Sequence, residues 1–252
     1  MKLIKKLCII FLFIPITLLS QEKDVKKVLL VGNSFTYFWN MPQMVNAMAQ
    51  LDNFPMEVRQ STVGGSTWEE HYNEKRGTKT RGLLNSEKWD YVVLQDHSLS
   101  TIEHLNRFNE YGEKLGDAIK NNGAKPYLMI TWAYLSNPLM QKVISKEYKE
   151  LAKNMNTEAI PVGEIFMKAR ELRPDLNFYF DDKHPSSIGS YLIALVMYKA
   201  LTGNSVHDIP NRLLSKDKDG EELILSFISN ETGTFLRQLV DETEFKNKLV
   251  QK

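Results

Sequence analysis

Short apolar runs rich in β-branched residues constrain the fold of this chain more than any other feature of its sequence. Runs of this length and composition are typical of strands buried between layers of helices. Four are clear and the fifth is weaker: Lys27–Val31, Met56–Gln60, Tyr91–Gln95, Pro126–Thr131 and Glu158–Val162. Because they recur along the whole chain, they predict a single sheet built from distant segments.

The segments between and after these runs carry apolar residues at helical spacing. They span Met41–Leu51, Leu105–Lys120, Ser145–Met155, Val162–Arg173 and Ser187–Leu201. The last of them is expected to be a strongly amphipathic helix that ends at Gly203. Alternating strands and helices predict an α/β fold in which a parallel sheet has helices on both faces.

The first 20 residues have the features of a secretory signal peptide. Lys2, Lys5 and Lys6 are followed by the apolar stretch Leu7–Leu19 and by the small residue Ser20. This stretch is shorter than the roughly 20 residues that a membrane-spanning helix needs. We expect cleavage after Ser20 and a secreted or periplasmic protein; an uncleaved N-terminal anchor is the alternative.

Composition excludes some classes of function. Removal of residues 1–20 would take away three lysines and no acid, and would move the formal charge from +1 to −2. That balance argues against a nucleic-acid partner, which would favour a concentrated basic surface. Cys8 is the only cysteine, so the remaining chain would form no disulfide. We expect residues 21–252 to be one domain, with a charged, moderately helical extension from about 207 that covers the sheet or forms a surface appendage.

Three polar segments follow directly on predicted strands. They are Ser34, Gly64-Gly65 and Gln95. In parallel α/β sheets the active site lies beyond the carboxyl ends of the strands, so these segments are expected at the same edge.

Ser34 is the candidate nucleophile, in Gly32-Asn33-Ser34-Phe35-Thr36. A serine between a strand and a helix projects from the sheet edge, and its N–H is free to bind a developing oxyanion. The alternative is that Asn33 and Ser34 only cap the following helix.

His184 is the candidate base, because a serine hydroxyl needs one to act as a nucleophile. Among the five histidines of the chain, it is the one with a carboxylate three positions earlier in a turn-like setting, Asp181. That carboxylate can accept the imidazole N–H and fix its tautomer. Asp182 competes for this role, and loop solvation is the alternative for both acids.

A tetrahedral intermediate also needs hydrogen-bond donors that converge on its oxygen. The Ser34 amide, a glycine amide within Val63–Thr67 and the Gln95 side chain could supply them. Glycine suits close approach of the backbone to a substrate. The alternatives are a plain turn for Gly64-Gly65 and a capped strand end for Gln95.

Taken together, these segments resemble the SGNH (GDSL-like) hydrolase superfamily over nearly the whole chain after residue 20. Gly32–Thr36 is similar to its first block, with asparagine in place of the usual aspartate. Gly65-Ser66-Thr67 is similar to the second block, with Gly64 as the other possible oxyanion donor. Asp181-x-x-His184 is similar to the fifth block, which carries the catalytic acid and base.

The third block departs from the family pattern Gly-x-Asn-Asp. The equivalent stretch, Val92–Ser98, reads Val-Val-Leu-Gln-Asp-His-Ser and has no asparagine. Some members resemble it in carrying Val-Leu-Gln, and the resemblance assigns the third oxyanion role to Gln95.

The resemblance implies a three-layer α/β/α sandwich of the flavodoxin-like type and ester hydrolysis with no metal or organic cofactor. We expect an exported esterase that uses Ser34, His184 and Asp181 on a small-molecule or polysaccharide ester, with carbohydrate deacetylation favoured. A lipid esterase or thioesterase and a non-catalytic glycan-binding module are the alternatives. The substrate's acyl group and alcohol, and the oligomeric state, stay open.

Substrate contacts are expected from Trp132 and Tyr134, which follow the fourth strand, and from His97. Core packing is the alternative for each aromatic side chain. Asp96 and His97 lack a third ligand at metal-site spacing. His71 and His104 are interpreted as surface helix residues.

Overall fold

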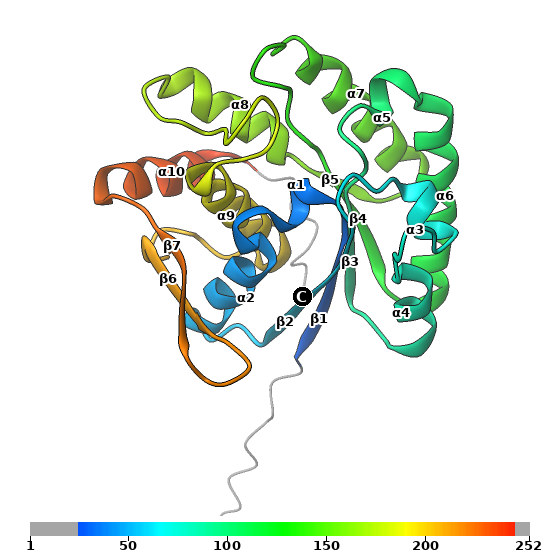
Figure 1. The fold of residues 1–252 in the computed structure, drawn as a ribbon, viewed down its shortest axis with the longest axis horizontal. Coiled ribbons are helices and arrows are strands. Elements are labelled where there is room, and N and C mark those ends of the chain that lie inside the picture. Colours follow the sequence, from blue (N-terminus) through cyan, green and yellow to red (C-terminus); the bar gives the residue numbers. More distant parts are fainter. Residues whose placement is uncertain (1–24, 245–252) are drawn as a thin grey trace, which may run out of the picture.

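A five-stranded parallel sheet forms the centre of the computed structural model, which describes residues 25–244 (Figure 1). Its strands follow the order β2-β1-β3-β4-β5. They are β1 (Lys26–Gly32), β2 (Met56–Thr62), β3 (Tyr91–Leu94), β4 (Lys125–Met129) and β5 (Glu158–Ile160). The predicted α/β fold with about five parallel strands is confirmed. The signal peptide predicted for residues 1–20, with Cys8 and the cleavage after Ser20, lies outside the described residues.

Helices cover both faces of the sheet, because successive strand side chains point to opposite sides. In β1, Val28 and Leu30 join one core, whereas Leu29 and Val31 join the other. The helices over the first core are α2 (Met41–Leu51), α8 (Val162–Leu172) and α9 (Ser187–Thr202). Those over the second are α3 (Trp68–Tyr72), α4 (Thr80–Ser86), α6 (Leu105–Asn122) and α7 (Met140–Asn154).

The last helix of the sandwich, α9, is not amphipathic, contrary to the sequence-based expectation. Every residue from Tyr191 to Tyr198 is fully buried. The outward side of α9 is covered by α10 (Asn230–Glu242), so all its faces are apolar. None of the helices within the described range is long and apolar enough to cross a membrane.

The segment from about residue 207 contains one helix and also a pair of strands that the sequence analysis did not predict. It contains an antiparallel hairpin, β6 (Arg212–Lys216) and β7 (Glu222–Phe227), which packs on α2 before α10 begins. The hairpin turns at Asp219-Gly220, where Gly220 has a φ of +88°. Leu213 and Leu225 are buried in the first core, so the segment covers the sandwich and is no appendage.

The connections after β1 and β3 define the edge where a site can form. In the order β2-β1-β3-β4-β5 the chain leaves β1 and β3 toward opposite faces, which opens a crevice between their carboxyl ends. The short helix α1 (Ser34–Tyr37) begins directly after β1, and α5 (Ser100–Glu103) follows β3. Ser34 and Gln95 therefore flank this crevice.

Candidate active site

Ser34, His184 and Asp181 form a continuous series of hydrogen bonds at the carboxyl edge of the sheet. Ser34 Oγ lies 3.0 Å from His184 Nε2, and His184 Nδ1 lies 2.7 Å from Asp181 Oδ2. Such a series lets the imidazole take the hydroxyl proton during attack, while the carboxylate stabilises the imidazolium. The structure thus brings together the three residues proposed from sequence for catalysis.

Asn33 fixes the turn that carries Ser34. It is the N-cap of α1, with an extended backbone, and its Oδ1 accepts a hydrogen bond from the Phe35 N–H at 3.1 Å. Its Nδ2 donates to the Ser66 carbonyl at 2.9 Å. Because Asn33 alone performs the capping, the Ser34 hydroxyl is left to pair with His184.

The Gln95 side chain is hydrogen-bonded to the turn that carries Ser34. Its side chain is 1% exposed, and its Oε1 accepts from the Asn33 N–H at 3.0 Å and from Thr36 Oγ1 at 2.9 Å. An N–H can only donate, so the amide oxygen of Gln95 must be the atom that faces residues 32–36, the nucleophile turn. The Gln95 Nε2 donates to the Asp96 carbonyl. Gln95 therefore holds this turn from beneath with its oxygen, and one of its two amide N–H groups is used within the protein, so the oxyanion role of the other stays a prediction.

Gly32 explains how Gln95 comes so close to the nucleophile turn. A Cβ atom at Gly32 would lie 2.4 Å from Gln95 Oε1 and 2.5 Å from Thr36 Oγ1. Only glycine leaves room at this strand end for both polar atoms.

Backbone hydrogen bonds fix the loop before α9 that carries His184, which we call the histidine loop (residues 179–185). Phe180 N–H donates to the His184 carbonyl at 2.8 Å, and Tyr179 and Pro185 form an isolated antiparallel bridge. Asp181 Oδ1 accepts from the Lys183 and His184 N–H groups at 2.8 and 2.7 Å. Its other oxygen is thereby aimed at the imidazole.

Asp182 and Asp181, which the sequence left as competitors, have separate partners. Both carboxylate oxygens of Asp182 accept hydrogen bonds from Ser136, one from its N–H and one from its hydroxyl, each at 2.8 Å. Asp182 thus ties the histidine loop to the segment after β4. The imidazole is left to Asp181.

The carboxylate of Asp181 is held in its charged form. Burial alone would raise its pKa, but hydrogen bonds from the His184 ring and from the His184 and Lys183 N–H groups outweigh burial. Together they lower the pKa of Asp181 to about 2. A permanent anion at this place favours an imidazolium during proton transfer.

Aromatic side chains orient the His184 ring. Phe38 stacks on it at a centroid distance of 4.3 Å, and Phe35 meets it edge-on at 5.8 Å. Trp132, predicted to contact substrate, is fully buried instead and stacks on Phe35 at 4.5 Å. Its indole N–H donates to the Lys183 carbonyl at 2.9 Å, so Trp132 supports the histidine loop from below.

Three backbone N–H groups are available to bind an oxyanion. Among the contacts of residues 25–244, the N–H groups of Ser34, Gly64 and Gly65 donate to no protein group, so the choice between the two glycines stays open by this criterion. Gly65 has a φ of +67° and open space where a Cβ would lie, as expected of a backbone that a substrate approaches. A Cβ at Gly64 would meet the Tyr37 hydroxyl at 3.1 Å.

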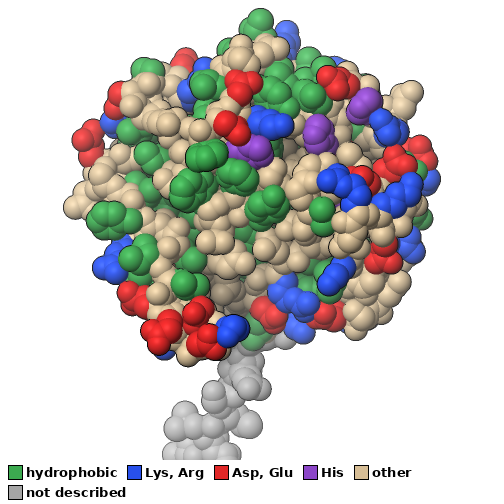
Figure 2. All heavy atoms as spheres, viewed as in Figure 1, with side chains coloured by type: hydrophobic (Ala, Val, Ile, Leu, Met, Phe, Trp, Pro, Cys, Tyr) green, Lys and Arg blue, Asp and Glu red, His purple; other side chains and the backbone are tan. Residues whose placement is uncertain are grey.

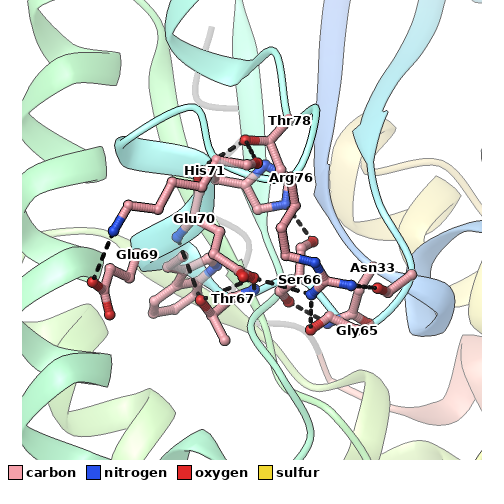
Figure 3. Close-up of polar contacts among 12 residues, drawn as sticks. Asn33, Gly65, Ser66, Thr67, Glu69, Glu70, His71, Arg76 and Thr78 are labelled. Atoms are coloured by element: carbon pink, nitrogen blue, oxygen red, sulfur yellow. Dashed lines mark hydrogen bonds and ion pairs between the residues drawn. The ribbon is translucent and has the colours of Figure 1, made fainter.

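His71 is fully buried, so its interpretation as a surface residue was wrong. Figure 3 shows it near the turn that carries Gly65 and Ser66. Its Nε2 lies 3.0 Å from the Gly32 carbonyl and 2.9 Å from Ser66 Oγ, and its Nδ1 lies 2.7 Å from Thr80 Oγ1. Burial lowers the pKa of His71 to about 4 despite the hydrogen bond to Gly32. The neutral ring thus ties the Ser66 turn to the end of β1. The polar residues around it gave no signal, because they come from separate segments.

Asp96 and His97 point to different places. Asp96 is buried and accepts from the Trp68 N–H at the start of α3 at 2.7 Å, and burial raises its pKa to about 6. His97 follows the end of β3, its ring is half-buried, and burial, followed by the charge of Lys183, lowers its pKa. Tyr134 is also half-buried, and its hydroxyl lies 2.7 Å from Ser98 Oγ. His97 and Tyr134 thus lie at the edge that holds Ser34.

Within the described part of the chain, no three His, Cys, Asp or Glu side chains are grouped to hold a metal ion.

A surface hollow of about 560 Å³ lies between α4 and α6, lined by residues such as Arg81, Lys114 and Asn122. Ser86 and Asn122 precede β3 and β4, so this hollow lies at the amino edge of the sheet, away from Ser34.

No protein-family model and no curated protein sequence matches this chain. Solved structures do match it. One is a protein from Slackia heliotrinireducens assigned by inference to the SGNH hydrolases, with 28% identity over 70% of this chain and 98% of that one, and a TM-score of 0.61.

Two further solved structures share the fold at lower identity. A DUF4886 family protein from Bacteroides uniformis is 20% identical over 86% of this chain and 94% of that chain, with a TM-score of 0.67. The acetyl xylan esterase AlAXEase is 16% identical over 69% of this chain and 99% of that chain, with a TM-score of 0.59. The chain therefore has the SGNH hydrolase fold, and its neighbours support membership of that superfamily and hydrolase chemistry.

Proposed function

We propose that this protein, whose fold is that of the SGNH hydrolases, is an exported serine esterase that cleaves carboxylic esters through an acyl-enzyme. The observation that carries the proposal is the hydrogen-bonded series Ser34–His184–Asp181. A glycan-binding module on the same fold would not require all three groups in register. Export rests on the sequence of residues 1–20 alone.

The reaction begins when Ser34 Oγ attacks the ester carbonyl carbon and His184 Nε2 takes its proton. The carbonyl oxygen becomes an oxyanion, which accepts hydrogen bonds from the Ser34 and Gly65 N–H groups. The imidazolium, stabilised by Asp181, then gives its proton to the leaving alcohol. Water attacks the acyl-enzyme in the same way, which releases the acid and restores Ser34.

The direction of proton transfer indicates where the alcohol binds. His184 Nε2 must reach the leaving oxygen, so the alcohol lies on the histidine side of Ser34. That side carries exposed aromatic rings: Phe180 is 64% exposed, and Trp39 is 45% exposed. Figure 2 shows hydrophobic side chains gathered beside a histidine over α1 and α9.

Trp39 and Phe180 are held in place around the histidine loop. Their rings meet edge-on at 6.3 Å, and the Trp39 indole N–H donates to the Pro185 carbonyl at 3.0 Å. Trp39 also has a φ of +53°, an unfavourable conformation for a bulky residue. Strain and exposure at one aromatic residue beside a reactive centre point to a binding role.

These flat rings suit the apolar face of a sugar, so we take the substrate to be an acylated carbohydrate, most simply an acetate. The acetyl xylan esterase among the structural neighbours is in keeping with this choice. A lipid ester or thioester would instead depend on a long acyl chain, which the test below distinguishes.

The test is hydrolysis of p-nitrophenyl acetate, its longer-chain homologues and acetylated sugars by residues 21–252, beside Ser34→Ala. We expect activity on acetates that the substitution abolishes. Equal activity of Ser34→Ala would remove Ser34 as nucleophile. Preference for long acyl chains would assign the protein to lipid esters, and inactivity of the folded protein on all esters would favour the glycan-binding module.

A further inference from the structure

We propose that Arg76 is a positioning residue that sets the direction of the Gly65 N–H, and so builds one half of the oxyanion site. This inference rests on the proposed esterase function. It concerns an arginine on a loop between α3 and α4, outside the segments that resemble the family blocks. Figure 3 shows its guanidinium against the turn that carries Gly65.

The Arg76 guanidinium binds both carbonyl groups of the Gly64-Gly65 turn. Its Nη2 donates to the Gly64 carbonyl at 2.9 Å and its Nη1 to the Gly65 carbonyl at 3.2 Å. In a trans peptide the C=O and the next N–H point in opposite directions. With the Gly64 carbonyl turned toward Arg76, the Gly65 N–H must point away from it, toward the open side.

The turn needs such an anchor because two adjacent glycines have little conformational preference of their own. Its base is fixed: Ser66 N–H donates to the Val63 carbonyl at 3.0 Å, and Ser66 Oγ donates to the Gly32 carbonyl at 3.1 Å. Among residues 25–244, however, Arg76 supplies every hydrogen bond made by Gly64 and Gly65 themselves. Without it, the peptide between the glycines could rotate and turn its N–H away from substrate.

The guanidinium is itself held in position. Glu70 Oε2 accepts from Arg76 Nη1 at 3.3 Å, and the same oxygen accepts from the Thr67 N–H at 2.9 Å in a capping box at the start of α3. Arg76 has a φ of +54°, which is unfavourable for a side chain of this size. An exposed ion pair such as Arg76–Glu70 contributes little to stability. We therefore attribute to it the placement of the Arg76 guanidinium on the glycine turn.

A cation on these carbonyls also polarises the peptides. Hydrogen bonds in a chain strengthen one another, so a guanidinium on the Gly64 carbonyl makes the Gly65 N–H a better donor. Both effects act when negative charge develops on the substrate oxygen. They should therefore alter kcat and leave substrate binding almost unchanged.

The experiment compares Arg76→Gln and Arg76→Lys with Arg107→Gln. Arg107 is the matched control, because its side chain is about as exposed as that of Arg76. It pairs at 3.4 Å with Glu69, which neighbours Glu70 in α3, and it does not contact the Gly64-Gly65 turn. Three quantities are measured: kcat per titrated active site, KM, and the affinity of an alkylboronic acid, whose tetrahedral adduct with Ser34 places an oxygen in the oxyanion site.

We expect Arg76→Gln to lower kcat about tenfold at unchanged KM, less than the hundredfold or more that loss of a whole donor costs. Boronate affinity should fall by a similar factor. Arg76→Lys should lie between, since an ammonium cannot bind both carbonyls as a planar fork does. Arg107→Gln should match the wild type in all three quantities.

Wild-type kcat and boronate affinity in Arg76→Gln would overturn the inference, and so would an equal loss in Arg107→Gln. A smaller titrated fraction with normal kcat per site would make Arg76 merely structural and would also overturn it. If the wild-type protein hydrolyses no ester, the esterase proposal fails. Boronate binding, measured by calorimetry, then still decides the role of Arg76. A wild-type protein that binds no boronate contradicts both proposals.

Discussion

His184 Nε2 lies 3.0 Å from Ser34 Oγ although 150 positions separate the two residues in the chain. The contact closes because β1 ends beside the loop that precedes α9, at the carboxyl edge of the sheet. It turns two short motifs, each weak by itself, into one reactive centre.

The two adjacent aspartates of the histidine loop should have different effects on catalysis. Asp181→Asn removes the anion that holds His184 Nδ1 at 2.7 Å, and we expect kcat to fall about 10⁴-fold. Asp182→Asn, which affects only the contact with Ser136, should leave kcat close to the wild-type value. Steady-state kinetics on p-nitrophenyl acetate checks both, and a reversed order would reassign the orienting carboxylate.

Replacement of Gln95 should reveal how strongly its side chain supports the turn that carries Ser34. Gln95→Ala leaves the buried Asn33 N–H and Thr36 hydroxyl without their acceptor, so the free energy of unfolding should fall by about 1–3 kcal/mol. Gln95→Glu, when its carboxyl group is protonated, keeps an acceptor oxygen and a donor, so its free energy of unfolding should fall less. Chemical denaturation measures this. Normal stability of Gln95→Ala together with a large loss of kcat would contradict this supporting role and favour a direct contact with the oxyanion.

Acidification should destabilise the protein through His71. The unfolded ring binds a proton below pH 6.5, whereas the buried ring resists protonation until about pH 4. Stability therefore falls as the pH drops through this interval, by on the order of 3 kcal/mol. His71→Gln should be less stable at pH 7 and lack this component.

The matched measurement for His71 is the difference in unfolding free energy between wild type and His71→Gln at several pH values. Subtraction cancels other groups, among them Asp96, whose raised pKa makes stability fall in the opposite direction, as the pH rises from 3.8 to about 6. A difference that stays constant from pH 7 to 4 would contradict the assignment of His71.

The exposed aromatic rings should select the alcohol of the substrate. Trp39→Ala and Phe180→Ala should each lower kcat/KM on an acetylated oligosaccharide by about tenfold, the upper range for one aromatic contact. Hydrolysis of ethyl acetate, which has no ring, should not change. Leu139→Ala is the control, since Leu139 is 84% exposed and has no part in this cluster. Equal losses on both esters would place the rings elsewhere in the mechanism.

Local patterns in the sequence were sufficient for the sheet and for most of the large helices. Strand and helix periodicities depend on neighbouring residues, and α2 matches its predicted bounds Met41–Leu51. The hairpin β6–β7 was missed because its short turn signal at Asp219-Gly220 was outweighed by the charged composition around it. The short helices α3, α4 and α5 carry too few turns to show a period.

The sequence by itself determined the fold class and named Ser34, Asp181 and His184, because spacing within a strand, a helix or a four-residue turn is a local property. Only the tertiary structure decided which atoms meet. It turned the oxygen of Gln95 toward the nucleophile turn, buried Trp132 and His71, gave Asp182 to Ser136 and set Arg76 on the glycine turn. Each of these depends on segments that packing brings together from distant parts of the chain, and no local pattern encodes their orientation.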